Sequence, residues 1–468
     1  MTPQSSDTGL GGLEPRSGAA GPVAFGEALR VWARIGLLGF GGPAGQVALM
    51  HRELVERRHW IDEARFLHAL SYCTLLPGPE AQQLATYVGW LLHRTPGGLA
   101  AGLLFVLPGA LAIGALSALY AGYRELPAIA ALFFGLKAAV LAVVVEAVIR
   151  IGRRALIARL QRVLAALAFI AIYFFELPFP LIVSLAGLTG WLASRLAPQA
   201  IPQAPEQRAA GGAESAVERM AAAGQLEHTR PTRGRALKSV ATWSAAWLLP
   251  LAALSAWPGL PPVLAEQAWF FSRAAVVTFG GAYAVLAYVA QQAVEHYAWL
   301  APGEMLDGLG LAETTPGPLI LVLQFVGFLG AYREPGALSP GTAGALGAAV
   351  TLWATFAPCF LWIFAGAPYV EALRGNRGLR AALSSITAAV VGVISNLSLW
   401  FGLHVLFREV AERRLGPLRW LAPELASLDP VSAALCALAL VALLRFHLGV
   451  PATLALSAGL GALAQLAG

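Results

Sequence analysis

The residues Pro77-Gly78-Pro79 interrupt an apolar stretch, and three polar side chains follow directly: Glu80, Gln82 and Gln83. Proline removes a backbone donor and breaks a helix, and a broken helix inside a bilayer leaves N–H and C=O groups without partners. Membrane proteins tolerate such breaks where they line a cavity or lie buried in protein. The types and spacing of these residues therefore predict a site that handles an anion or a proton.

The same pattern recurs 239 residues later in the chain. Pro77-Gly78-Pro79 falls on Pro316-Gly317-Pro318, and Phe40-Gly41-Gly42 falls on Phe279-Gly280-Gly281. The correspondence needs no gap over the whole stretch, which indicates an internal repeat. The other matching pairs are Arg34 with Arg273, six residues before each Phe-Gly-Gly, Glu56 with Glu295, and Trp60 with Trp299.

Such breaks suit an anion because each second half-helix begins with N–H groups that have no intrahelical partner. The helix dipole adds positive potential at this end. Pro43, Pro79 and Pro318 are expected at the first helical position, where proline is favoured. Arg34 and Arg273 add full positive charges about two turns before their Phe-Gly-Gly breaks. Guanidinium forks and backbone N–H groups together suit a compact oxyanion.

Each of these interpretations has a simpler alternative. A Pro-Gly-Pro can be a plain kink between two spans, and either arginine can extend its charged end to the membrane surface. Glu80 can cap its half-helix or carry a proton, and the residues leave both open. Gln82 and Gln83 can donate to the ligand or bond helix to helix. The other charged residues that could serve as proton carriers are Glu313, Asp307, Lys137 and Glu146.

The predicted site can be stated residue by residue. The substrate-binding residues that we expect are Arg34, Gly41, Gly42, Gly78, Glu80, Gln82, Gln83, Arg273, Gly280, Gly281 and Gly317. The expected helix breaks are Pro43, Pro77, Pro79, Pro316 and Pro318, and the expected proton-coupling residues are Glu80 and Glu313. No catalytic residue, metal ligand or cofactor is expected.

The composition places these breaks in a membrane protein. The chain has 468 residues, of which 57% are hydrophobic and 12% charged, whereas soluble domains are about 45–50% apolar and about 25% charged. Gly98–Tyr123 and Thr342–Phe364 exceed the roughly 18 apolar residues that mark a membrane span. Pro430–Leu444 and Pro451–Ala467 are slightly shorter but equally apolar. We expect an all-α polytopic membrane protein rather than a soluble enzyme.

Polar segments divide the chain into two membrane halves. Residues 1–22 are rich in Gly, Ser and Pro and lack the apolar core of a signal peptide, so we expect a disordered tail. The polar stretch 198–236 is expected to be a cytoplasmic linker between the halves 23–197 and 259–468. The apolar run 237–258 is then a linking transmembrane helix.

The loop charges predict that the two halves face opposite ways. The loop after the first Phe-Gly-Gly contains Arg52, Arg57 and Arg58, whereas Ala282–Trp299 contains no Lys or Arg. The positive-inside rule then gives opposite orientations. An inverted repeat whose broken helices form hairpins around a midplane site is a transporter architecture. One loop argues against inversion, because it would lie outside with Arg408, Arg413, Arg414 and Arg419, partly offset by Glu409 and Glu412.

At these motifs the sequence resembles the chromate transporter family, in the long form that fuses two homologous halves. The matching segments are GFGGPAGQ with the basic stretch up to Trp60, LLPGPEAQQLATYVGW, FGGAYAV and LGLAETTPGP. The resemblance covers nearly the whole chain and implies chromate efflux, with sulfate as a similar anion. It implies roles for the glycines and prolines of both motifs and for Arg34, Glu80 and Gln82. The second half departs from the first, because Leu319 and Ile320 follow its Pro-Gly-Pro.

We therefore expect a secondary active transporter of the inner (cytoplasmic) membrane that exports chromate and confers chromate resistance. The sequence has no phosphate-binding Gly-Lys motif and no nucleophile elbow, which argues against an ATPase or an intramembrane hydrolase. The alternatives are an importer of sulfate or another oxyanion, and a membrane scaffold or sensor without transport. The expected partners are a chromate or sulfate anion, the lipid bilayer and a second copy in a homodimer, and no nucleic acid.

Overall fold

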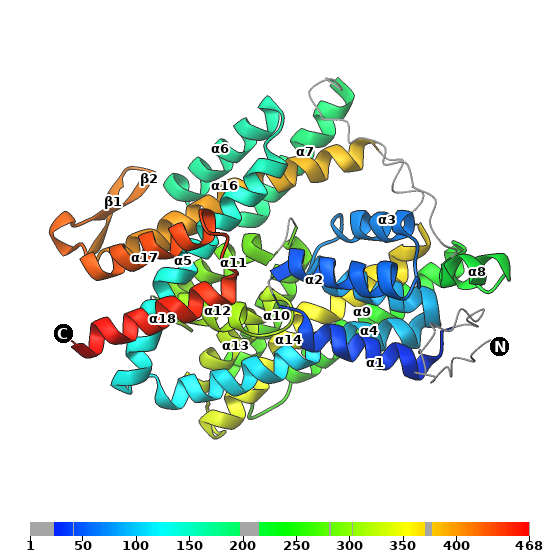
Figure 1. Cartoon of the computed structure of the whole chain (residues 1–468), viewed down its shortest axis with the longest axis horizontal. Coiled ribbons are helices and arrows are strands. Elements are labelled where there is room, and N and C mark those ends of the chain that lie inside the picture. Colours follow the sequence, from blue (N-terminus) through cyan, green and yellow to red (C-terminus); the bar gives the residue numbers. More distant parts are fainter. Residues whose placement is uncertain are drawn as a thin grey trace, which may run out of the picture.

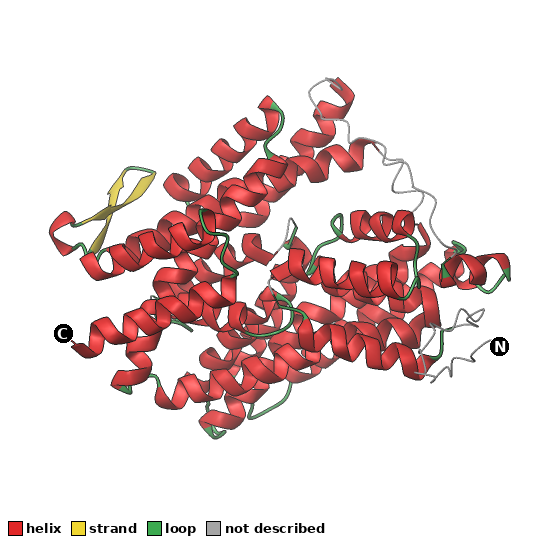
Figure 2. Cartoon of the chain, viewed as in Figure 1, coloured by secondary structure: helices red, strands yellow, loops and turns green. Residues whose placement is uncertain are grey.

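The computed structural model describes residues 23–40, 42–196, 215–279, 282–301, 303–369 and 377–467. Most of these residues are helical, and the strands among them form one short hairpin at an end of the long axis (Figures 1 and 2). Six helices in these ranges are long and apolar enough to cross a membrane. The predicted all-α polytopic membrane protein is confirmed. The predicted tail 1–22 and the predicted site residues Gly41, Gly280 and Gly281 lie outside the described residues.

The first half begins with two pairs of short helices. Its elements are α1 (Phe25–Leu38), α2 (Gly42–His51), the π-helical turn η1 (Arg52–Arg57), α3 (Glu63–Cys73), α4 (Glu80–Tyr123), α5 (Pro127–Ala155), α6 (Arg159–Phe175) and α7 (Phe179–Leu196). The long α4 contains a break, because His93 (φ −137°, ψ 29°) and Arg94 (φ 55°, ψ −152°) are not helical. The helices 63–73 and 80–92 thus form the predicted half-length pair around Pro77-Gly78-Pro79.

The second half repeats this order after the linker. Its elements are α10 (Pro262–Val277), α11 (Ala282–Gln291), η4 (Gln292–His296), α12 (Glu304–Thr314), η5 (Leu319–Leu321), α13 (Val322–Arg333), α14 (Pro340–Gly366), η6 (Ala367–Tyr369), α16 (Arg377–Leu406), β1 (Val410–Leu415), β2 (Leu418–Pro423), η7 (Leu425–Ser427), α17 (Pro430–Leu444) and α18 (Val450–Ala467).

The linker is folded over the part that the structure describes. It contains α8 (Ala216–Ala222) and η3 (Glu227–Thr229), and the linking helix α9 spans Arg233–Ser255, close to the expected 237–258. Ala216 and Val217 donate backbone N–H groups to the carbonyl oxygens of His59 and Trp60, at 2.8 and 3.0 Å. Val217 is fully buried. These contacts anchor the linker to the loop that follows η1.

The internal repeat is visible in backbone conformation. The π-helical turns η1 and η4 stand at equivalent positions and lead to His59 (φ 50°) and Ala298 (φ 51°), 239 residues apart. Gly78 (φ 118°) and Gly317 (φ 96°) also correspond. Positive φ is uncommon for residues other than glycine. Its recurrence at His59 and Ala298 shows that the halves share a backbone path and not only a short motif.

The two halves exchange their last helices. α6 and α7 pack on α16 of the second half, whereas α17 and α18 pack on α5 of the first half. Glycines allow the close approach: a Cβ on Gly135 of α5 would lie 2.0 Å from the Ser457 carbonyl oxygen of α18. A Cβ on Gly190 of α7 would lie 2.4 Å from the Ala381 carbonyl oxygen of α16. Small residues at such contacts are typical of membrane helix packing.

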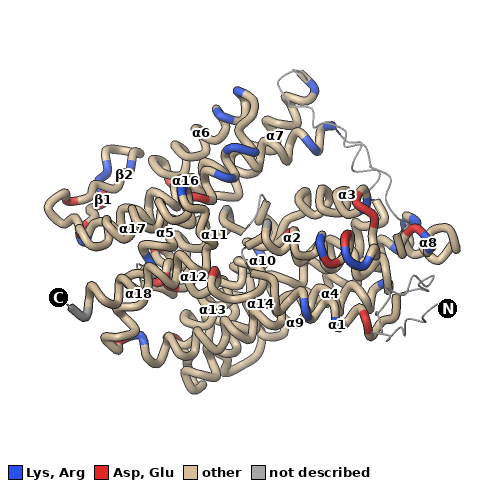
Figure 3. Tube along the Cα trace, in the orientation of Figure 1, with Lys and Arg blue, Asp and Glu red and all other residues tan. Residues whose placement is uncertain are grey.

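Charged residues gather at loops and helix ends (Figure 3). Helix α14 contains no Asp, Glu, Lys or Arg, and neither does α4 from residue 95 to residue 123. Charge-free stretches of this length are those expected of helices within a hydrocarbon layer.

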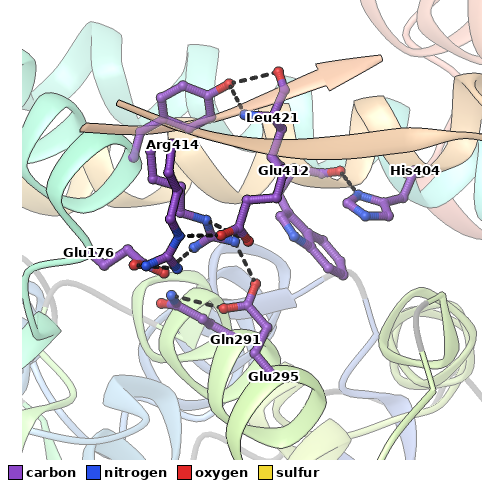
Figure 4. Close-up of polar contacts among 10 residues, drawn as sticks. Glu176, Gln291, Glu295, His404, Glu412, Arg414 and Leu421 are labelled. Atoms are coloured by element: carbon purple, nitrogen blue, oxygen red, sulfur yellow. Dashed lines mark hydrogen bonds and ion pairs between the residues drawn. The ribbon is translucent and has the colours of Figure 1, made fainter. Parts of the chain in front are cut away.

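The hairpin between α16 and α17 was not predicted from the sequence. β1 and β2 pair in antiparallel fashion around Gly416 (φ 60°). The Arg419 side chain, which is 11% exposed, lies 2.5 Å from Glu176, 3.0 Å from Glu412 and 3.2 Å from Glu295. Figure 4 shows where these three carboxylates lie. The hairpin therefore joins the α6–α7 turn of the first half to η4 of the second half.

These ion pairs involve the loop whose arginines argued against opposite orientations of the two halves. Arg414 also pairs with Glu412 at 2.6 Å and with Glu176 at 3.1 Å. Two of the arginines that argued against opposite orientations are thus neutralised by carboxylates, and one of those carboxylates comes from the other half. The pKa of the Glu412 carboxyl is held below its ordinary value, chiefly because Arg414 donates a hydrogen bond to it.

Arg419→Gln should destabilise the protein at pH 7. We expect the free energy of unfolding to fall by roughly 1–3 kcal/mol, because charge-assisted hydrogen bonds to carboxylates are lost. Arg419 contributes to the depressed pKa of Glu412, after Arg414. The part of the stabilisation that depends on Arg419 is therefore present above the unfolded value of about 4.3 and is lost as the pH falls through the folded value. Thermal unfolding in detergent should therefore show a difference between wild type and variant that shrinks below pH about 4.

Arg408→Gln is the matched control, because the Arg408 side chain is 76% exposed and lies 3.9 Å from Asp429. An equal loss of stability in both variants, or a difference that does not change with pH, would contradict the role assigned to Arg419.

Candidate functional site

Each Pro-Gly-Pro loop lies against the Phe-Gly-Gly break of the other half. The Gly78 N–H donates to the Thr278 carbonyl oxygen at 2.8 Å, and the Gly317 N–H donates to the Gly39 carbonyl oxygen at 3.0 Å. Both donors and both acceptors are 239 residues apart. Gly39 and Thr278 directly precede Phe40 and Phe279. This reciprocal pair of hydrogen bonds relates the two halves by an approximate twofold axis.

Gln46 strengthens one of these contacts, although the sequence did not single it out. This buried side chain donates from Nε2 to the carbonyl oxygens of Gly39 and Gly317, at 3.2 and 2.6 Å. Gln46 belongs to the GFGGPAGQ motif. A polar residue within a short apolar helix, directly after a break, was the signal that could have identified it.

The predicted glutamines use their donors within the first half. Gln83 donates to the Pro77 carbonyl oxygen at 2.7 Å, and Gln82 donates to the Thr86 hydroxyl at 3.1 Å. Both residues are fully buried. These two bonds lie within α4 and between α4 and the loop that precedes it, so they are not the helix-to-helix bonds considered from the sequence. The ligand-binding role of both glutamines stays a prediction.

Close packing around the loops depends on glycine. Gly78 and Gly317 have positive φ. A Cβ on Gly78 would also lie 2.9 Å from the Cys359 sulfur and 2.9 Å from the Gln83 amide nitrogen. A Cβ on Gly109 of α4 would lie 2.2 Å from the Pro316 carbonyl oxygen. The loops are therefore enclosed by protein, as required of irregular backbone at membrane depth.

The prolines lie one position away from the prediction. Pro79 and Pro318 have extended backbone (ψ 102° and 136°) and precede the first residues of α4 and η5, whereas Pro43 is the second residue of α2. The extended prolines close the loops before the helices start. The helices then begin at Glu80 and Leu319, whose N–H groups have no intrahelical acceptor.

The two predicted proton-coupling residues have different surroundings. The half-buried carboxylate of Glu80 accepts no hydrogen bond from the described residues, so it does not cap α4 in this structure. Glu313 is 6% exposed and accepts a hydrogen bond from the Tyr283 hydroxyl at 2.6 Å. Glu80 is therefore unpaired in the described part of the chain, and Glu313 is paired.

The two predicted arginines lie on exposed helix faces. Arg34 is exposed on α1 next to the exposed Leu37 and Leu38. Arg273 is exposed on α10, and its Nε donates to the Trp269 carbonyl oxygen at 3.2 Å. Neither guanidinium forms an ion pair with a carboxylate among the described residues. The two Pro-Gly-Pro loops and both glutamines are thus buried, whereas both arginines are exposed.

Comparison with known proteins supports the resemblance noted in the sequence. A family model described as Chromate transporter matches residues 26–191 and 265–463, and so covers both halves but not the linker. No solved structure matches the chain.

Individual relatives carry names of the same kind. A "Chromate transport protein" of Pseudomonas aeruginosa is 32% identical, over 80% of this chain and 80% of its own length. A "Chromate transport protein" of Cupriavidus metallidurans is 29% identical, over 77% of this chain and 79% of its own. A "Probable chromate transport protein" of Synechococcus elongatus is 27% identical, over 77% and 80%.

Gly317→Ala should destabilise the protein, because alanine is strained at the positive φ of this loop. We expect the free energy of unfolding to fall by about 1–3 kcal/mol, measured by thermal unfolding in detergent. Gly122→Ala is the control: this helical glycine has open space around it, and alanine there should be neutral or stabilising by up to about 1 kcal/mol. Equal effects of the two substitutions would show that the loop conformation is not required.

Proposed function

Since the chain belongs to the chromate transporter family, we propose that it exports chromate across the cytoplasmic membrane as a secondary active transporter. The observation that carries this proposal is the reciprocal pair of hydrogen bonds between breaks of opposite halves. Two halves related by a twofold axis, with broken helices at their boundary, are the architecture in which a site can open alternately to either side.

The substrate site in this proposal is the boundary at the two loops. The first turn of α4 lies there, and its free backbone N–H groups are suited to donate to an anion. Chromate is a compact oxyanion whose oxygens accept from such donors. The enclosing protein keeps bulk water away, which strengthens each of these contacts.

The arginines have an approach role in this proposal. Arg34 and Arg273 occupy equivalent positions, and neither is paired with a carboxylate of the described residues. A charge in an apolar segment is costly and usually serves an ion pathway. In this proposal, both arginines attract the chromate dianion electrostatically from the exposed faces of α1 and α10 toward the breaks.

The driving force in this proposal is the proton gradient or the membrane potential. Glu80 stands at the start of α4 without a partner among the described residues, so its carboxyl can gain or lose a proton without breaking a contact there. Leu319 occupies the equivalent place in the second half. The two breaks are therefore chemically unequal, and Glu80 belongs to the first one alone.

Transport can be tested in inverted membrane vesicles, where export appears as uptake. Radiolabelled chromate should accumulate, an uncoupler should abolish the accumulation, and Arg34→Ala or Arg273→Ala should lower the initial rate about tenfold, equivalent to about 1.4 kcal/mol. Arg30→Ala is the matched control, because Arg30 is exposed on the same helix and its repeat position holds Trp269. Its rate should stay close to that of the wild type.

The same assay separates chromate from sulfate, which has the same charge and shape. Excess sulfate should inhibit only weakly if chromate is the preferred substrate. No flux of either anion would reject transport, and unchanged rates in both arginine variants would reject the approach role of these side chains.

A further inference from the structure

Besides Glu313, helix α12 of the second half contains two further buried acids, and these two lie against the first half. Glu304 and Asp307 are each 3% exposed and lie one helical turn apart. Their helix packs on α5 and α4 of the first half and on α13 and α18 of its own half. The equivalent positions of the first half hold Arg65 and His68. The acids therefore belong to the second half alone.

Glu304 is fully bonded. Its Oε1 pairs with Arg124 and with Arg333, the latter at 2.7 Å, and its Oε2 accepts the Ala301 N–H at 2.7 Å. Two guanidinium groups and a backbone N–H thus contact both carboxylate oxygens of this side chain. Glu304 therefore fastens α12 to α4 and α13.

Only one of the two carboxylate oxygens of Asp307 has a partner among the described residues. The Tyr120 hydroxyl donates to Oδ2 at 2.7 Å, and the Lys137 Nζ lies 3.5 Å from the same oxygen. Oδ1 is buried and has no hydrogen-bond partner among the described residues. An unpaired buried carboxylate oxygen is costly, and a neutral carboxyl is less costly to bury than an ionised one. Oδ1 is thus a vacant position for a proton.

A hollow between α5 and α18 lies beside this pair. Lys137 is 33% exposed and lines a cavity of ≈ 330 Å³ between α5 and α18, together with Pro127, Phe134 and Gln465. Lys137 lies about 15 Å along α5 from its first residue, Pro127. That is about half of a hydrocarbon layer roughly 30 Å thick. The cavity therefore runs along α5 from its first residue to the Lys137 side chain of the ion pair.

We propose that proton-driven transport needs a second carboxyl besides Glu80: Asp307 binds and releases a proton, and its ionised carboxylate pairs with Lys137. The proposal rests on the proposed function. The ionised carboxylate pairs with Lys137 and ties α12 of the second half to α5 of the first half. When Asp307 takes up a proton on Oδ1, this ion pair is lost and the contact of α12 with α5 weakens. Proton binding is thereby coupled to the position of α12 relative to α5 and to the helices α17 and α18 that pack on α5.

The other charged and titratable groups around Asp307 do not compete for this role. Tyr120 comes from α4, Arg124 from the α4–α5 turn and Arg333 from α13, and Glu304 stands on the same helix as Asp307. Both arginines are bound to Glu304. Helix α18 contributes no titratable residue.

The test uses the full chain in liposomes and separates exchange from driven transport. Exchange of radiolabelled chromate at equal concentrations on both sides needs no proton gradient, whereas accumulation does. The exchange rate of Asp307→Asn should stay within about twofold of the wild-type rate. Its proton-driven accumulation of chromate should fall at least about tenfold, and a pH dye trapped in the liposomes should report no proton flux. Glu125→Gln, at an 86% exposed side chain on the same α4–α5 turn as Arg124, is the control and should keep both activities.

Each outcome decides between the proposals. Asp307→Asn with full accumulation, or with exchange lost as well, overturns the proton role of Asp307. If Asp307→Asn fails to fold, the double variant Lys137→Met with Asp307→Asn takes its place, because it removes both charges of the ion pair. Proton-driven accumulation by the double variant would also overturn the proton role of Asp307. Wild-type accumulation that follows membrane potential without proton flux overturns the proton role and leaves chromate transport standing. Wild type without any chromate exchange rejects the proposed function itself.

Discussion

The reciprocal backbone hydrogen bonds between Gly78 and Thr278 and between Gly317 and Gly39 are the constraint on which the arrangement of the two halves depends. A helix broken at Pro-Gly-Pro leaves backbone donors that a bilayer cannot satisfy. Each half satisfies a donor of its own loop with a carbonyl of the other half. The positive φ of both glycines, the close approach of Gly109 to Pro316, and the bonds from Gln46 all follow from holding the loops in these positions.

The symmetric backbone supports chemistry that is not symmetric. Glu80 corresponds to Leu319, and Gln46 corresponds to Val285, so the polar groups at the breaks belong to the first half. Asp307 corresponds to His68, so the buried acids of α12 belong to the second half. The proposed anion site at the breaks and the proposed proton site at Asp307 therefore rest on residues that have no counterpart in the other half.

Much of the architecture was predictable because local sequence patterns specify it. The constant offset revealed the repeat, and proline and glycine marked the breaks at Pro77-Gly78-Pro79 and Pro316-Gly317-Pro318. The exchange of α6 and α7 for α17 and α18 was not predictable, since hydrophobic runs identify spans but not their neighbours. The hairpin was missed because Arg419 finds Glu176 and Glu295 only through the fold. The exposure of Arg34 and Arg273 likewise depends on which helix face packs, and a duplicated charge does not reveal that.

The exchanged helices determine which parts of the molecule can move as rigid bodies. α6 and α7 are packed on α16, and α17 and α18 are packed on α5, so a displacement of one half as the sequence delimits it would strip these helices from their partners. The mechanical units are therefore composed of segments from both repeats. A hinge for alternating access is then expected at connections inside each repeat, such as the non-helical His93–Arg94 step of α4, rather than at the linker between the repeats.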